Sequence, residues 1–165
     1  MSETHAPTRP ARPTDARTPV AGLILGDIVA LAFAVVGPTF AGVMGWLFFF
    51  LVLQAALIAA VALVIEWVGL ASMAFAGMPV QRWRHRVHVV LWGLLVVHGL
   101  TRSDITDAYG LPSMLEQAGA PQLVEVVSYP LGAIAVFVAV MLGMVGFASI
   151  ADAGSARRES RRALA

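Results

Sequence analysis

Apolar residues dominate four stretches of the chain, at about residues 20–37, 42–67, 84–101 and 124–150. A helix needs about 20 predominantly apolar residues to cross the hydrocarbon core of a bilayer. The four stretches meet or approach this length, and polar residues gather between them and at the chain ends. The pattern therefore predicts an all-α, polytopic membrane protein with four transmembrane helices in a membrane domain of residues 19–151.

The third stretch is the least obvious of the four, because its uninterrupted apolar part is only residues 89–97. On a helix, Arg82 and Arg102 would lie about 30 Å apart, which matches the thickness of the hydrocarbon core. Arginine side chains at the ends of a short span can also reach back to the headgroups. We therefore interpret this stretch as a membrane-crossing helix with arginine at both ends.

The distribution of arginine predicts the orientation. Positively charged residues favour the cytoplasmic side of a membrane, and four crossings place all three arginine clusters on one side, whereas three crossings would put one outside. We expect both termini in the cytoplasm and the protein in the cytoplasmic (inner) membrane of a prokaryote. The clusters are Arg9, Arg12 and Arg17; Arg82, Arg84 and Arg86; and Arg157, Arg158, Arg161 and Arg162.

The segments outside the four stretches have simple expectations. Residues 1–18 are rich in proline and threonine and lack apolar periodicity, which is typical of a disordered tail. Residues 68–78 either continue the second helix or lie at the interface. Residues 152–165 form a basic tail that could contact anionic lipid headgroups.

The outer loop, residues 102–123, carries signals for short helices. The pairs Thr101 with Asp104 and Ser113 with Glu116 have capping-box spacing, and Gly119 is suited to end a helix. We expect one or two short interfacial helices here.

Tryptophan is expected at the ends of the second helix. Trp46 and Trp67 would lie about 31 Å apart on a helix, at opposite interfaces. Glu66 would then fall at the cytoplasmic boundary.

Composition supports the membrane class and excludes several kinds of site. Of 165 residues, 59% are hydrophobic and 13% are charged, whereas about a quarter are charged in soluble domains. The chain has no cysteine, which excludes disulfides, thiolate nucleophiles and cysteine-ligated metals. A net charge of +1, with arginines confined to helix ends, gives no sign of a nucleic-acid partner.

Asp27 is the costliest residue to place in a bilayer, because it lies within the first apolar stretch. Gln54 on the second stretch would lie at a similar depth in an antiparallel hairpin. One interpretation is a protonated Asp27 that hydrogen-bonds to Gln54 or to a backbone carbonyl and stabilises packing. The alternatives are a proton or cation relay and a polar contact with a partner subunit.

Glycines provide candidate surfaces for close helix packing. Gly22 and Gly26 have small-xxx-small spacing on the first helix, and Gly143 and Gly146 give the fourth a smooth side. We expect these positions to contact a neighbouring backbone.

His88 and His98 are candidate haem ligands, but they lie about 15 Å apart on one helix and cannot bind the same iron. A basic cluster followed by a helix with histidine near its far end resembles the third-helix region of ferric-reductase-like membrane cytochromes. The resemblance covers the stretch from Arg82 to Arg102, and the further ligand histidines of that family are missing here. It implies haem b as a cofactor, whereas the residues themselves favour no cofactor.

Three functions follow from these features. The leading hypothesis is an accessory, anchor or assembly subunit without catalysis of its own, which packs against a partner membrane protein or a second copy through its small residues and Asp27. The alternatives are a haem b-binding subunit of a redox complex and a small proton or ion transporter that uses Asp27. The sequence shows no recognisable catalytic motif, which leaves an intramembrane enzyme open without supporting one.

Overall fold

Four long helices form the body of the protein in the computed structural model, which describes residues 14–40, 42–43, 45–46, 48–105, 110–119 and 123–163. They are α1 (Thr14–Phe40), α2 (Leu53–Phe75), α3 (Arg82–Thr101) and α5 (Leu123–Ala163). A short π-helix, Phe48–Val52, leads into α2. The all-α prediction is confirmed.

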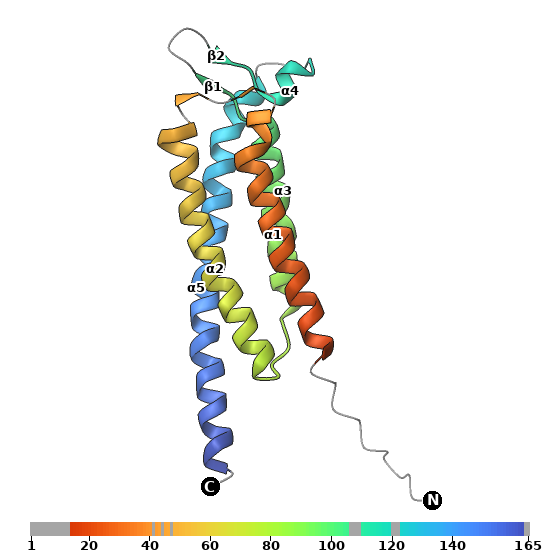
Figure 1. The fold of residues 1–165 in the computed structure, drawn as a ribbon, viewed down its shortest axis with the longest axis vertical. Coiled ribbons are helices and arrows are strands. Elements are labelled where there is room, and N and C mark those ends of the chain that lie inside the picture. The colour runs from red at the N-terminus through yellow and green to blue at the C-terminus, as the bar shows by residue number, and fades with distance from the viewer. Residues whose placement is uncertain are drawn as a thin grey trace, which may run out of the picture.

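The long helices run side by side in alternating directions (Figure 1). α1 packs against α2 and α3, and α5 packs against the same two helices, most extensively against α2. This arrangement puts α1 opposite α5 and α2 opposite α3. The core between them is made of small and branched apolar side chains, which are Ala30, Ala34, Ala59, Leu63, Leu91, Leu95, Ala135, Ala139 and Leu142.

The two ends of the bundle differ in character. The start of α1, the α2–α3 connection and the end of α5 lie together at one end, which we call the arginine end (Figure 1). At the other end, which we call the loop end, β1 (Asp104–Ile105) pairs antiparallel with β2 (Gly110–Leu111), and α4 (Met114–Gln117) follows. The hairpin was not expected from the sequence.

Three helices are long and apolar enough to cross a membrane, over Val20–Phe40, Phe50–Phe75 and Val126–Ala163. Their outward faces expose large apolar side chains, for example Val61 (62%) on α2 and Phe147 (71%) on α5. A water-soluble bundle would carry polar residues on these faces. The exposed apolar surface is therefore compatible with a membrane protein.

α1 extends beyond both of its predicted ends. It begins at Thr14, so the last residues of the predicted tail are helical, and residues 1–13 lie outside the described part of the chain. It also continues through Pro38 to Phe40. Pro38 has no N–H to donate to the carbonyl of Ala34, and the Arg102 guanidinium donates to that oxygen instead, at 3.3 Å. The turn comes later, at Gly42, with φ of +78°.

α2 continues as a helix to Phe75, so most of residues 68–78 extend the second helix. Its end is closed by Gly77, with φ of +72°. The predicted end of the last helix at residue 150 is wrong, because α5 runs through Pro130 and on to Ala163. The basic segment at its end is rich in alanine and arginine, which favour a helix even outside an apolar environment.

The loop end confirms one predicted helix cap and corrects the other. Ser113 N donates to Glu116 Oε2 at 2.7 Å and Glu116 N donates to Ser113 Oγ at 3.2 Å, which is the capping box of α4. Thr101 does not start a helix. It is the last residue of α3, and its hydroxyl donates to the carbonyl of Val97 at 2.8 Å.

Glycines permit the close approach of α2 and α5. A Cβ on Gly143 would lie 2.8 Å from the Ala62 carbonyl oxygen, and one on Gly146 would lie 2.8 Å from the Glu66 backbone nitrogen. Gly69 on α2 lies directly against the Gly146 backbone. Gly22, by contrast, is exposed and meets no described atom within 4 Å of its added Cβ.

This difference can be tested with two alanine substitutions. Gly146→Ala should lower the free energy of unfolding by about 1–3 kcal/mol, because the methyl group overpacks the α2–α5 contact. Gly22→Ala should leave it unchanged or raise it by up to about 1 kcal/mol, because alanine restricts the unfolded chain and meets nothing. Denaturation in mixed micelles, followed by circular dichroism, measures both. Equal stability of the two variants would contradict the packing described.

Candidate functional site

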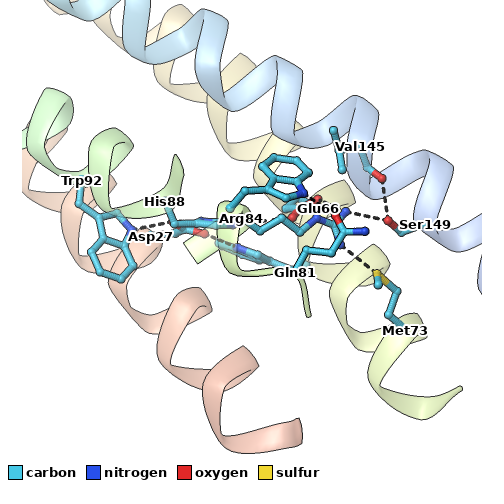
Figure 2. Close-up of polar contacts among 11 residues, drawn as sticks. Asp27, Glu66, Met73, Gln81, Arg84, His88, Trp92, Val145 and Ser149 are labelled. Atoms are coloured by element: carbon cyan, nitrogen blue, oxygen red, sulfur yellow. Dashed lines mark hydrogen bonds and ion pairs between the residues drawn. The ribbon is translucent and has the colours of Figure 1, made fainter. Parts of the chain in front are cut away.

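A connected group of polar side chains lies inside the bundle, towards its arginine end. It draws on all four long helices, and we call it the buried polar cluster. Its members are Asp27, Glu66, Trp67, Arg84, His88, Trp92 and Ser149. Figure 2 shows most of them converging between the helices. Burial of such groups among apolar helices has a high free-energy cost, so the cluster is the leading candidate for a functional site.

Asp27 accepts hydrogen bonds at both carboxylate oxygens. Trp92 Nε1–H donates to Oδ1 at 2.7 Å and Trp67 Nε1–H donates to Oδ2 at 2.8 Å. His88 Nδ1 lies 2.8 Å from Oδ1. An indole N–H can only donate, so the two tryptophans hold Asp27 as an acceptor with its 0% exposed side chain fixed in place.

His88 lies between two carboxylates. Its Nδ1 contacts Asp27, and its Nε2 is 3.7 Å from Glu66 Oε1. This second distance is longer than a hydrogen bond, and neither Nε2 nor Oε1 has a hydrogen-bond partner in the described part of the chain. Both side chains are 0% exposed. The cluster therefore contains a gap in which His88 Nε2 and Glu66 Oε1 face each other without a hydrogen bond.

Arg84 connects Glu66 to α5. Its Nη2 lies 3.4 Å from Glu66 Oε2 and donates to Ser149 Oγ at 2.7 Å. Its Nη1 donates to Met73 Sδ at 2.9 Å. The Arg84 side chain is 1% exposed, so the guanidinium charge lies inside the protein and is compensated there.

The charges of the cluster balance only with an added proton. Two carboxylates and one guanidinium leave a net charge of −1 when His88 is neutral. A net charge is expensive in a low-dielectric interior. One further proton brings the sum to zero, and His88, which contacts both carboxylates, is placed to hold it.

The sequence contained a signal for part of this cluster. Arg84, His88 and Trp92 follow each other at intervals of four residues, which puts them on one face of α3. That face lies against the core, because Arg84 and His88 are buried and Trp92 packs on the apolar core cluster. A polar stripe with helical spacing is thus the signal for the buried side of α3.

Several predicted contacts on α2 are wrong. Gln54 is exposed and does not bond to Asp27, because Asp27 lies level with Trp67, which is about 20 Å further along α2 than Gln54. Glu66 is 0% exposed and lies in the core, not at the boundary. Trp67 points inward to Asp27 instead of anchoring an interface.

The four predicted packing glycines fall into two groups. Gly143 and Gly146 face α2 within the chain, and Gly26 lies directly against the Trp92 ring. Gly22 faces open space. Three of the four positions therefore serve internal contacts.

His98 lies apart from the cluster, near the other end of α3. Its Nδ1–H donates to the Ser128 carbonyl at 2.9 Å, and its ring lies over Gly132 of α5. His98 lines a cavity of about 220 Å³ between the helices.

The two histidines therefore differ as haem candidates. His88 is 0% exposed and faces a carboxylate at each ring nitrogen, which leaves it no open side for an iron. Haem ligation by His98 stays a prediction. Asp27 and Glu66 contact different nitrogens of His88 and do not converge on one point. Within the described residues, no three histidine or carboxylate side chains form a metal site.

Removal of the Asp27 carboxylate should strongly destabilise the fold. In Asp27→Ala, the N–H groups of Trp67 and Trp92 and the Nδ1 of His88 lose their partner, and we expect the free energy of unfolding to fall by about 3–5 kcal/mol. Gln54→Ala, at an exposed polar position on α2 away from the cluster, should change it by less than about 0.5 kcal/mol. Denaturation in mixed micelles gives both values. An Asp27→Ala variant as stable as Gln54→Ala would show that these hydrogen bonds do not hold the helices together.

Comparison of the chain with protein-family models, curated proteins and solved structures finds no match. The buried polar cluster and the cavity beside His98 are the features of the structure that bear on its function. Both lie among the long helices, and both depend on side chains of α3.

Proposed function

We propose that the chain is a four-span protein of a prokaryotic cytoplasmic membrane, with both termini in the cytoplasm. The common position of the N-terminal start of α1, the α2–α3 connection and the end of α5 supports this topology (Figure 1). The arginine cluster 82–86 begins α3 directly after the connection, and the cluster 157–162 lies at the end of α5; positively charged residues favour the cytoplasmic side. α3 has 20 residues, which gives about 30 Å of helix and suffices for a crossing.

Within this topology the protein acts as a small transporter or relay of protons, with the buried polar cluster as its proton-binding site. The observation that carries this proposal is the position of His88 between Asp27 and Glu66. The sequence offered Asp27 alone, and one carboxylate makes a poor pathway. A histidine between two carboxylates is a far better one, because its two nitrogens can take up and release a proton at different positions.

The proposed step uses the gap between His88 and Glu66. When Nε2 and Oε1 approach from 3.7 Å to about 3 Å, a proton can pass between them. At the other side of the ring, Nδ1 already contacts Asp27. Arg84 holds Glu66, and the two tryptophans hold Asp27, so the ring is the element that exchanges the proton.

The described conformation is closed towards the loop end. Leu63 lies about one turn beyond Glu66 on α2, and Leu91 lies about one turn beyond His88 on α3. Both side chains are 0% exposed, and no polar group of the cluster lies between them. Transport therefore requires a second conformation in which these leucines separate, as in alternating access.

Proton flux into liposomes tests the role of Asp27. Asp27→Asn keeps the shape of the side chain but removes the charge, so the variant should lower flux to the level of empty liposomes. A pH-sensitive dye inside proteoliposomes measures this after a potential is applied. Gln54→Ala should retain the flux of the unchanged protein. If folded Asp27→Asn conducts protons as fast as the unchanged protein, the cluster is not the pathway.

An accessory, anchor or assembly subunit is the second candidate. Asp27, Gly26, Gly143 and Gly146 are used inside the chain, so they do not support a partner contact. The observation that favours this function is a groove of about 610 Å³ on the outer side of α2 and α5. Its walls are apolar and include Leu57, Ile58, Val61, Val140, Met144 and Phe147.

Purification in mild detergent separates the two functions. An accessory subunit should bring a second membrane protein with it in a fixed ratio, and Met144→Trp in the groove should release that protein. Gly22→Trp, at the exposed glycine of α1, serves as a control for an added aromatic ring on a lipid-facing surface. A monodisperse monomer without a companion protein would speak against the subunit function and leave the transporter proposal standing.

A further inference from the structure

The cavity beside His98 is a second place where the chain can bind a molecule. It lies between the long helices on the loop-end side of the apolar core and has a volume of about 220 Å³. Its walls are mostly small aliphatic side chains, including Ala34, Ala55, Ala56 and Ala59. Leu51, which is 52% exposed, is part of its lining. A molecule dissolved in the membrane can thus enter from the side.

Two residues with polar side chains, His98 and Tyr129, line this cavity, and His98 offers it a defined acceptor. A backbone carbonyl can only accept, so the contact with Ser128 fixes the hydrogen of a neutral His98 on Nδ1. Nε2 then carries a lone pair, and no described group bonds to it. Nε2 is also not completely buried, as an enclosed unpaired nitrogen would be. It is therefore accessible, on a side chain that lines the cavity.

Gly132 holds the imidazole in this orientation. A Cβ at this position would lie 2.8 Å from Cε1 and 3.0 Å from Nδ1 of His98. Any larger residue would push the ring away from α5 and break its bond to Ser128. The glycine and the carbonyl together keep Nε2 aimed as an acceptor.

The size of the cavity limits the ligand to about one ring. A dry cavity of about 150 Å³ in another protein binds benzene, whereas pockets for drug-sized molecules start at about 300 Å³. A volume of about 220 Å³ therefore suits a six-membered ring with a few further atoms. An anion is disfavoured, because no arginine or lysine side chain is among the residues that line the cavity.

We infer that this cavity binds a membrane-soluble phenol, a single aromatic ring whose hydroxyl donates to His98 Nε2. The aliphatic walls bury the ring, and the hydroxyl satisfies an acceptor that a hydrocarbon would leave unpaired. The site is independent of the proton proposal. His98 lies ten residues beyond His88, about 15 Å along α3, and Leu91 and Leu95 stand between them.

Binding of 4-fluorophenol to the full chain in lipid nanodiscs tests the inference, with fluorine NMR as the readout. The phenol should give saturable binding above that of empty nanodiscs. 4-Fluorotoluene, which has the same shape but no hydroxyl, should bind at least fivefold more weakly after correction for partition into lipid. Ala56→Leu, which fills part of the cavity, should weaken both probes.

A matched variant isolates the hydrogen bond. His98→Phe keeps a ring against Gly132 but has no acceptor, so the preference for the phenol should disappear. His98→Leu provides the same test if the phenylalanine variant does not fold, and Gly22→Ala on the outer surface should behave like the unchanged chain. Unaltered preference in the His98 variants overturns the inference. It is also overturned if neither probe saturates and native mass spectrometry shows a retained phospholipid that Ala56→Leu releases.

Discussion

A single carboxylate, Asp27, dictates much of how the helices are arranged. A charged group inside an apolar helix bundle has to be paired, and removal of one partner from a buried pair costs about 3–5 kcal/mol. Asp27 meets this requirement with donors from α2 and α3, namely Trp67, His88 and Trp92. These contacts fix α1 against both neighbours at one rotation about its axis. His88 and Arg84 then extend the polar contacts to Glu66 and to α5.

Glycine packing and the polar cluster are parts of the same arrangement. Gly26 precedes Asp27, and its missing side chain lets the Trp92 ring lie directly against α1 while the indole N–H reaches the carboxylate. Gly146 does the same for Glu66, whose backbone and carboxylate fill the space that a Cβ would need. The close approach of α2 and α5 thus brings Ser149 within reach of Arg84. The small residues matter here because they let short polar contacts form across the bundle.

The sequence predicted the helices well and their ends poorly. Hydropathy identifies a stretch that avoids water, but it does not register a helix that continues beyond the apolar part, as α5 does to Ala163. Hydropathy also does not show that Pro38 can stay in α1. Pro38 leaves the carbonyl of Ala34 without an N–H donor, and Arg102, 68 residues beyond Ala34, donates to that carbonyl instead. Such a contact depends on tertiary structure and leaves no local pattern.

The candidate site was predictable in part for a related reason. The cost of a carboxylate in an apolar stretch singled out Asp27 correctly as a residue that needs a partner. Counting from the predicted helix ends then suggested Gln54, but α1 continues to Phe40 and α2 begins at Leu53, so Asp27 lies level with Trp67 instead. The direction of each side chain around its helix also decides the contact. The four-residue spacing of Arg84, His88 and Trp92 carries that directional information for α3. The adjacent positions of Glu66 and Trp67 carry no such directional information, because two neighbouring residues alone do not show which side of a helix faces the core.

The two histidines of α3 separate two kinds of chemistry on one helix. His88 lies among charged groups, where we propose that its ring exchanges a proton, and His98 is held by a carbonyl beside an apolar cavity. Leu91 and Leu95 insulate one environment from the other. The two environments also lie against different helices, since His88 contacts Asp27 of α1 and faces Glu66 of α2, whereas His98 contacts α5 at Ser128 and Gly132. A substitution at one histidine therefore leaves the contacts of the other in place, and the two sites can be tested separately.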